Sequence, residues 1–192
     1  MISLKDKIMT TTNQSAGVRG QSAKERATQL LQQDEAGQEK TIQMEPSKAL
    51  YLLNCKDCTL TIEGKPIKIS IENCENLVLK VTDKILTSVL DVWGSKNVEI
   101  DCERAVGFLQ LESVQGFKFR LPDPEYFNEM IWVASDDIVL HLGTEKHELG
   151  SSKMEAKPDQ RNDLDQFITC RKSTGLSTEV RSDMAGYPVR RA

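Results

Sequence analysis

The sequence predicts an all-β fold, a solenoid of about 20 residues per coil that ends in a C-terminal β-hairpin. Three observations lead to this prediction. Short apolar runs begin at Ala49 and alternate with polar residues, as strands do. These runs recur at a nearly constant spacing. The pattern stops at Gly143, and two further short runs flank a polar turn near the C-terminus.

The repeat becomes visible when one turn residue of each coil is placed in register. These residues recur every 19 to 21 positions, at Asn54, Asn73, Gly94, Ser113 and Ala134. The fourth, sixth and eighth positions after each turn residue are apolar or nearly so: Cys58, Leu60, Ile62; Leu77, Leu79, Val81; Val98, Ile100, Cys102; Phe117, Phe119, Leu121; Ile138, Leu140, Leu142. A second apolar pair precedes each turn: Leu50 and Leu52, Ile69 and Ile71, Leu90 and Val92, Leu109 and Leu111, Met130 and Trp132. Each coil therefore contains two alternating strands.

Stacking of the coils explains why the apolar positions repeat. A single coil cannot bury its own apolar face, but stacked coils pair their strands in parallel and share one interior. Alternation then places Leu60 and Leu79 inside and Thr61 and Lys80 outside. An antiparallel sandwich with evenly spaced strands is the alternative. Five consecutive repeats without a gap favour the solenoid.

The regions outside the repeat have different compositions. Residues 1–45 are rich in Thr, Gln, Ser and charge, and we expect a disordered or partner-bound tail with a short helix over 22–33. The domain itself is expected to span 46–186, with a charged loop over 143–163 and a hairpin within 164–182, its strands at 166–171 and 176–181. A basic tail follows at 187–192.

Composition excludes several classes of protein. Twenty-five Lys and Arg against 29 Asp and Glu give a net charge of −4, which is unlike proteins that bind the phosphate backbone of nucleic acids. The polar N-terminus has no signal-peptide core, and no apolar run approaches the ~20 residues of a membrane span. We therefore expect a cytoplasmic protein whose five cysteines are thiols. The glycosylation sequon at Asn13 would then be unused.

One part of the sequence resembles a known family. Residues 58–77 carry Gly64-Lys65 between two strands and Asn73-Cys74 at the next corner. This arrangement resembles the C-terminal domain of cyclase-associated proteins. The similarity runs from about Lys48 to Leu142 and resumes at 163–167 and 176–186. The tubulin-folding cofactor C domain is a related solenoid. The resemblance implies a right-handed parallel β-helix whose C-terminal hairpin is exchanged between two protomers.

The resemblance also implies a function. Cyclase-associated proteins bind actin monomers, prefer the ADP form and promote its exchange to ATP, so we expect an actin-binding regulator of the cytoskeleton that works as a homodimer. The outward alternation selects the partner-binding residues: Lys65, Lys68, Ser70, Thr87 and Val89, with Thr178 and Val180 of the last strand. The alternative is that these are ordinary solubilising residues.

Residues with catalytic or metal-binding chemistry are few. Cys55 and Cys58 form a Cys-x-x-Cys pair, and Cys74 and Cys102 are one coil apart from each other in the repeat. A structural zinc site needs four ligands, usually two such pairs, whereas two of these four cysteines fall on interior positions. We interpret them as core residues. His141 and His147 lack a nucleophile or a metal partner nearby in sequence. No metal, cofactor or catalytic residue is therefore expected.

The tubulin cofactor group provides the enzymatic alternative. Its members stimulate GTPases with an arginine that follows a glutamine in a middle coil, and an inserted arginine stabilises phosphoryl transfer. The corresponding segment here, residues 107–113, contains no arginine; Arg104 precedes it and Arg120 lies at an outward position of the next strand. We therefore expect a binding module and not an enzyme. A scaffold subunit of a cytoskeletal or axonemal assembly is the remaining alternative.

Overall fold

The computed structural model describes residues 29–150 and 166–181. Within them the regular secondary structure is β-strand apart from one short 3-10 helix, η1, at Pro124–Tyr126. The strands are β1 Gln29–Gln33, β2 Glu39–Met44, β3 Ala49–Leu53, β4 Lys56–Gly64, β5 Ile69–Glu72, β6 Glu75–Val81, β7 Val89–Trp93, β8 Lys96–Cys102, β9 Val106–Glu112, β10 Gln115–Leu121, β11 Phe127–Val133, β12 Asp136–Leu142, β13 Glu145–Leu149, β14 Gln166–Lys172 and β15 Gly175–Arg181. No helix in this part of the chain is long and apolar enough to cross a membrane.

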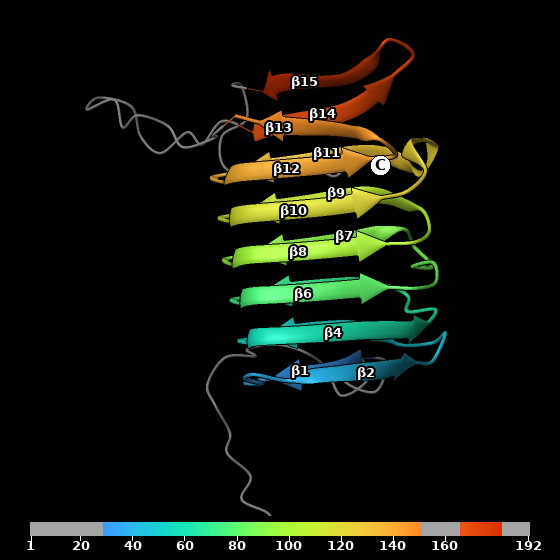
Figure 1. Cartoon of the computed structure of the whole chain (residues 1–192), viewed down its shortest axis with the longest axis vertical. Helices are drawn as coiled ribbons and strands as arrows, with labels where there is room; N and C mark the ends of the chain where they lie inside the picture. The colour runs from blue at the N-terminus through green and yellow to red at the C-terminus, as the bar shows by residue number, and fades with distance from the viewer. Residues whose placement is uncertain (1–28, 151–165, 182–192) are drawn as a thin grey trace, which may run out of the picture.

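The strands form two sheets that face each other across one interior. Sheet A has the order β1-β3-β5-β7-β9-β11-β14-β15, and sheet B has the order β13-β12-β10-β8-β6-β4-β2. Each coil from β1–β2 to β11–β12 contributes one strand to each sheet, and strands of successive coils pair in parallel. Figure 1 shows the coils stacked along the long axis and wound in a right-handed sense. The predicted parallel β-solenoid is confirmed.

Left-handed backbone at the corners fixes the register of the repeat. All five predicted turn residues have positive φ, between 48° and 56°. A second residue three positions later in each coil also has positive φ: Asp57, Asn76, Asn97, Gly116 and Asp137. Asparagine and aspartate tolerate this conformation, and the asparagine amides donate hydrogen bonds from coil to coil, as from Asn97 Nδ2 to Asn76 Oδ1 at 3.0 Å. These corners keep the two strands of every coil aligned with those of the next.

The interior contains the predicted apolar positions. Ile69, Leu79, Leu90, Ile100, Leu109 and Phe119 are all fully buried. Burial of one such side chain stabilises the fold by about 1.5–3 kcal/mol, and the coils share a single continuous core. The rings of Phe117 and Phe119 stack with centroids 6.5 Å apart.

The N-terminal boundary of the solenoid differs from the prediction. Residues 29–44, expected to belong to a tail with a helix over 22–33, instead form β1 and β2 of an additional first coil. The helix is therefore wrong for residues 29–33, and residues 22–28 lie outside the described chain. Pairing explains the difference, because Leu30 aligns with Leu50 of β3 and packs on the core. Tertiary contacts override the helix propensity of this segment.

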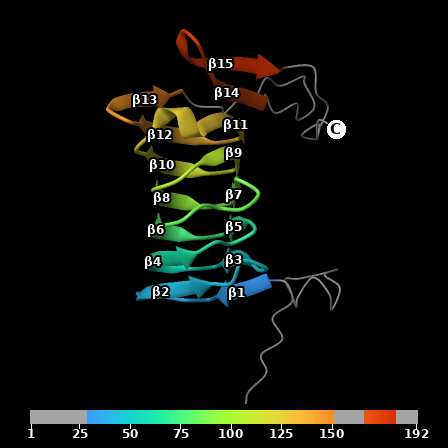
Figure 2. The same cartoon turned by 90° about the vertical axis from the view of Figure 1, so that its right-hand side faces the viewer.

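The C-terminal part contains two antiparallel additions. The predicted loop 143–163 is wrong for β13, which pairs antiparallel with β12; residues 151–165 lie outside the described chain. The predicted hairpin is confirmed as β14 and β15 and pairs antiparallel with β11. Phe167 stacks on Trp132 at 4.4 Å, and Trp132 Nε1 donates a hydrogen bond to Thr169 Oγ1 at 3.0 Å. Figure 2 shows the hairpin extending sheet A beyond the last full coil.

Candidate partner-binding surface

Two of the predicted binding residues, Lys65 and Thr87, lie at the corner that leads from sheet B to sheet A. Gly64 makes this corner possible, because its φ is +92° and a Cβ there would lie 2.3 Å from the Met44 carbonyl oxygen. The Lys65 ammonium lies 3.9 Å from the Asp83 carboxylate and its side chain is 49% exposed. Thr87 Oγ1 donates a hydrogen bond to the Ile67 carbonyl at 2.6 Å, which links the coil that contains Thr87 to the preceding coil.

Lys68, Ser70 and Val89 lie on the outer face of sheet A. The Lys68 ammonium makes an ion pair with the carboxylate of Asp91, which is almost fully buried. It also lies 5.8 Å from the ring centroid of Trp93, close enough for a cation–π contact. Because a buried carboxylate needs a cation, part of the role of Lys68 is structural.

The last two predicted binding residues, Thr178 and Val180, lie on the opposite side of sheet A. They pair with Thr169 and Phe167 of β14, whose side chains point toward the interior side at the end of the solenoid. The Thr169 and Thr178 hydroxyls are 3.0 Å apart, and Val180 is 53% exposed. The structure thus places the predicted residues on two surfaces, the corner with the outer face of sheet A and the C-terminal end.

The outward side chains of β3, β5, β7, β9 and β11 form a surface that we call the A face. Its apolar members are half-buried or nearly buried: Tyr51, Leu53, Val89, Trp93, Phe108, Ile131 and Val133. Its charged members are Glu72, Asp91, Glu112 and Glu129, together with Lys68, which directly precedes β5, so carboxylates outnumber ammonium groups by four to one. The A face is apolar and acidic.

The outward side chains of β4, β6, β8, β10 and β12 form the B face, which has a different character. Cations and carboxylates alternate along it, and Arg120 donates to Glu99 and, at 2.9 Å, to Asp101. Hydrogen bonds to these two carboxylates raise the pKa of Arg120 further. Arg120 is thus paired with two acids of its own surface. His141, also on this face, lies between Arg120 and Lys146 in the strand pairing.

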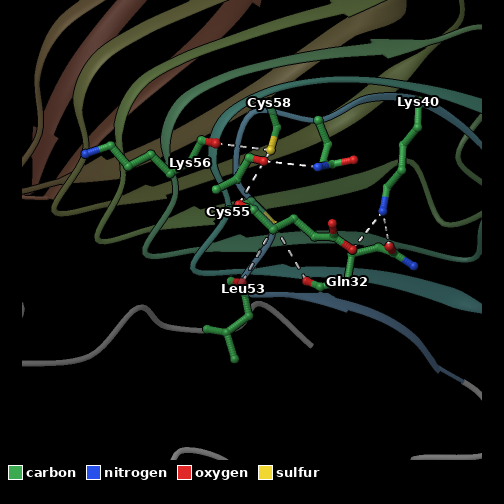
Figure 3. A network of polar contacts seen from close by, with 9 residues as sticks. Gln32, Lys40, Leu53, Cys55, Lys56 and Cys58 are labelled. Carbon is green, nitrogen blue, oxygen red and sulfur yellow. Dashed lines mark hydrogen bonds and ion pairs between the residues drawn. The ribbon is translucent and has the colours of Figure 1, made fainter.

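Three of the five cysteines, Cys55, Cys58 and Cys74, lie in the wall of the solenoid near its N-terminal end. The Cys55 and Cys58 thiols donate to backbone carbonyls, Cys55 to Gln32 at 3.7 Å and Cys58 to Lys56 at 3.2 Å (Figure 3). All except Cys170 are buried, which confirms their interpretation as core residues. No group of three potential ligands that could hold a metal occurs in residues 29–150 and 166–181.

Neighbouring groups shift the pKa values of these thiols. A hydrogen bond from the Cys74 thiol lowers the pKa of Cys55 to about 7, whereas the pKa of Cys74 is raised by the same contact. Burial raises the pKa of Cys102 to about 12. Because Cys55 is fully buried, reagents in solvent have no access to it despite its lowered pKa.

A charged side chain, that of Lys40, occupies an interior position in the first coil. Lys40 occupies the interior register opposite Leu60, and its ammonium donates to Gln32 and Glu35, each at 2.8 Å (Figure 3). An inward-pointing charge at an open end discourages the addition of further strands.

Sequence reasoning missed the acidic and apolar character of the A face. Alternation assigned Asp91 and Phe108 to outward positions, but it does not show which outward side chains cover one another. A signal existed for the buried pair, because the register Ser70–Asp91 makes Lys68 a diagonal neighbour of Asp91.

The architecture defines a class of protein: a parallel β-solenoid that carries antiparallel strands at its C-terminal end. The chain belongs to the adenylate cyclase-associated protein family, because the family model "Adenylate cyclase associated (CAP) C terminal" matches residues 23–179. The fold is similar to the crystal structure of cyclase-associated protein from Cryptosporidium parvum, with a TM-score of 0.57 and 17% identity over 88% of this chain and 97% of that one. No curated protein matches the chain.

Proposed function

We propose that this protein binds actin monomers and regulates actin turnover in the cytoplasm. The observation that carries the proposal is membership of the cyclase-associated family over residues 23–179. A solenoid wall supports a binding role, since it presents a broad, rigid surface made of strands from many coils. The buried thiols and the paired Arg120 offer no obvious nucleophile or arginine finger, so we propose a binding module that is not an enzyme.

The proposed actin contact includes Lys65, Thr87 and Val89, with Lys68 and Ser70 beside them. Of the two lysines, Lys65 is the better contact residue, because its side chain is more exposed and its ion pair with Asp83 is long. Lys68 is already paired with a buried carboxylate. The Lys65 ammonium would attract the acidic surface of actin, and this attraction would weaken as the salt concentration rises.

We propose further that the protein forms a homodimer through its C-terminal hairpin, which includes Thr178 and Val180. Strand β15 is the outer edge of sheet A, and an unpaired edge invites pairing. Val180 is exposed there, and Leu176 and Phe167 are only partly buried. An exchanged hairpin would repeat the Trp132–Phe167 stack between protomers with two-fold symmetry.

The test of actin regulation is fluorescent-nucleotide release from ADP-actin monomers, with and without the protein. We expect faster release in the presence of wild type, because a binder accelerates exchange when it favours the exchange-competent state of actin. Lys65→Glu should reduce the effect, whereas Lys80→Glu on the B face is the matched control. A wild-type protein that neither binds actin monomers nor alters release would exclude this function and favour a scaffold role.

The dimer has a separate test. Light scattering at tens of micromolar should give twice the mass of the 21.6 kDa chain. Val180→Asp should give a monomer or weaken the dimer. A wild-type protein that remains monomeric would contradict the dimer without affecting actin binding by one protomer.

A further inference from the structure

The A face carries partly buried apolar side chains on several neighbouring strands. Phe108 lies between Val89 and Glu129 across the strands, and Ile131 lies beside Gln110. The apolar character continues to the edge of the sheet, where Leu31 of β1 is 43% exposed. No described element lies over this face, since the two sheets are the only layers (Figures 1 and 2). An apolar surface with an excess of carboxylates suits a segment that is apolar and basic.

The sequence contains such a segment directly before the sheet. Residues 1–28 carry the cations Lys5, Lys7, Arg19, Lys24 and Arg26 against Asp6 and Glu25, a net charge of +3. They also carry Ile2, Leu4, Ile8, Met9 and Val18. The segment continues into β1, which is an edge strand of sheet A itself. The family model begins only at residue 23, so most of this segment lies outside the family match.

The segment is long enough to reach every part of the A face. From β1 to β14 there are six strand spacings, about 29 Å at ~4.8 Å each. An extended chain covers about 3.3 Å per residue, so roughly nine residues span this distance. The cations at Lys5 and Lys7 are separated from β1 by more than that.

We propose that residues 1–28 bind the A face of their own chain. The apolar side chains cover Phe108 and Ile131, and the lysines pair with Glu112 and Glu129. This inference does not depend on actin binding. If the proposed actin contact at Val89 and Ser70 is correct, the segment occupies part of the same surface and competes with actin, and that consequence rests on the proposed function.

The reactivity of a native cysteine can show whether the A face is covered. Cys170 of β14 lies opposite Glu129 on the outward side of sheet A, and it is partly exposed whereas the other four cysteines are buried. The experiment measures the rate at which an uncharged maleimide modifies Cys170 in the full-length protein. Acrylamide quenching of Trp93 is the second readout, because the other tryptophan, Trp132, is buried.

Two variants of the segment test the two kinds of contact, Lys5→Glu with Lys7→Glu and Ile8→Ser with Met9→Ser. Each should raise the Cys170 rate and the Trp93 quenching by roughly three- to tenfold, the range for losing two surface contacts. Lys80→Glu with Lys118→Glu changes the net charge equally on the B face and should leave both readouts unchanged. Cys170→Ser should abolish the fast labelling.

The outcomes are distinct. If both segment variants match wild type in both readouts, the proposal is overturned. If the B-face control changes the readouts as much as the Lys5 and Lys7 variant, net charge is the cause and the proposed pairing is wrong. If wild-type protection increases with protein concentration, the segment comes from a second copy and the same-chain contact is wrong. Protection that is independent of concentration and lost in both variants supports the proposal, whether or not actin binds.

Discussion

The two outer faces of the solenoid differ, although the strands beneath them follow one repeat. On the B face Arg120 is held by Glu99 and Asp101, and charges of both signs alternate. On the A face apolar side chains such as Phe108 lie among carboxylates, and Lys68 neutralises the buried Asp91. Interior side chains are the same kind in both sheets, because the fold requires them. The difference outside is not required by the fold, and it is the basis of our proposal that the A face serves in binding.

The largest predicted effect separates the interior from the A face within a single strand. Ile69→Asp places an unpaired charge in the core, which costs several kcal/mol against a total stability of ~5–15 kcal/mol. The variant should fail to fold. Ser70→Asp, one position along β5, should remain folded. Circular dichroism and thermal melting measure both, and a cooperatively melting Ile69→Asp protein would contradict the register.

A smaller effect separates the two faces. Lys68→Met leaves the buried Asp91 without its cation and should lower the free energy of unfolding by about 2 kcal/mol, less than the ~3–5 kcal/mol of a fully buried pair because Lys68 is partly exposed. Lys80→Met on the B face should change it by less than about 0.5 kcal/mol. Denaturant titrations compare the two variants, and equal effects would mean that the Lys68–Asp91 pair is not structural.

The smallest effect concerns the B face itself. Arg120→Ala removes two ion pairs from a partly exposed position and should cost at most about 1 kcal/mol. This cost should decrease in high salt, because solvent ions screen such pairs. Thermal melts at low and high salt give the measurement. A large loss of stability that does not depend on salt would contradict this expectation and would show that the B-face ion pairs contribute substantially to stability.

Sequence reasoning predicted the solenoid well because its strongest signals are local and repeated. The turn residues from Asn54 to Ala134 and the interior set around Leu79 depend only on spacing and alternation. The first coil was missed because the segment around Leu30 has only a weak apolar pattern. Leu30 becomes a core residue only when β3 lies beside it. β13 was missed because its charged sequence resembles a loop and forms a strand by pairing with β12.

The candidate surface was harder to predict than the fold. Alternation correctly assigned Lys68 and Ser70 to the outside, but the burial of Asp91 beneath Lys68 depends on neighbours from other coils. Alternation also selects Thr178 and Val180 as partner-binding residues, yet strand pairing puts them on the other side of the sheet from the lysines. The spacing of residues along the sequence does not show which residues share a surface, because that depends on how the strands stack in three dimensions.

The affinity for monomeric actin of two matched variants tests the central claim, that the corner at Lys65, together with the neighbouring Val89, forms the actin contact. Lys65→Glu with Val89→Asp changes this surface, and Lys80→Glu with Thr61→Asp changes the B face by the same charge. Anisotropy of labelled actin monomers should give a dissociation constant about tenfold weaker for the first variant, equivalent to ~1.4 kcal/mol, and one unchanged from wild type for the second. Equal affinities for the two variants, or a loss confined to the B-face variant, would contradict the account.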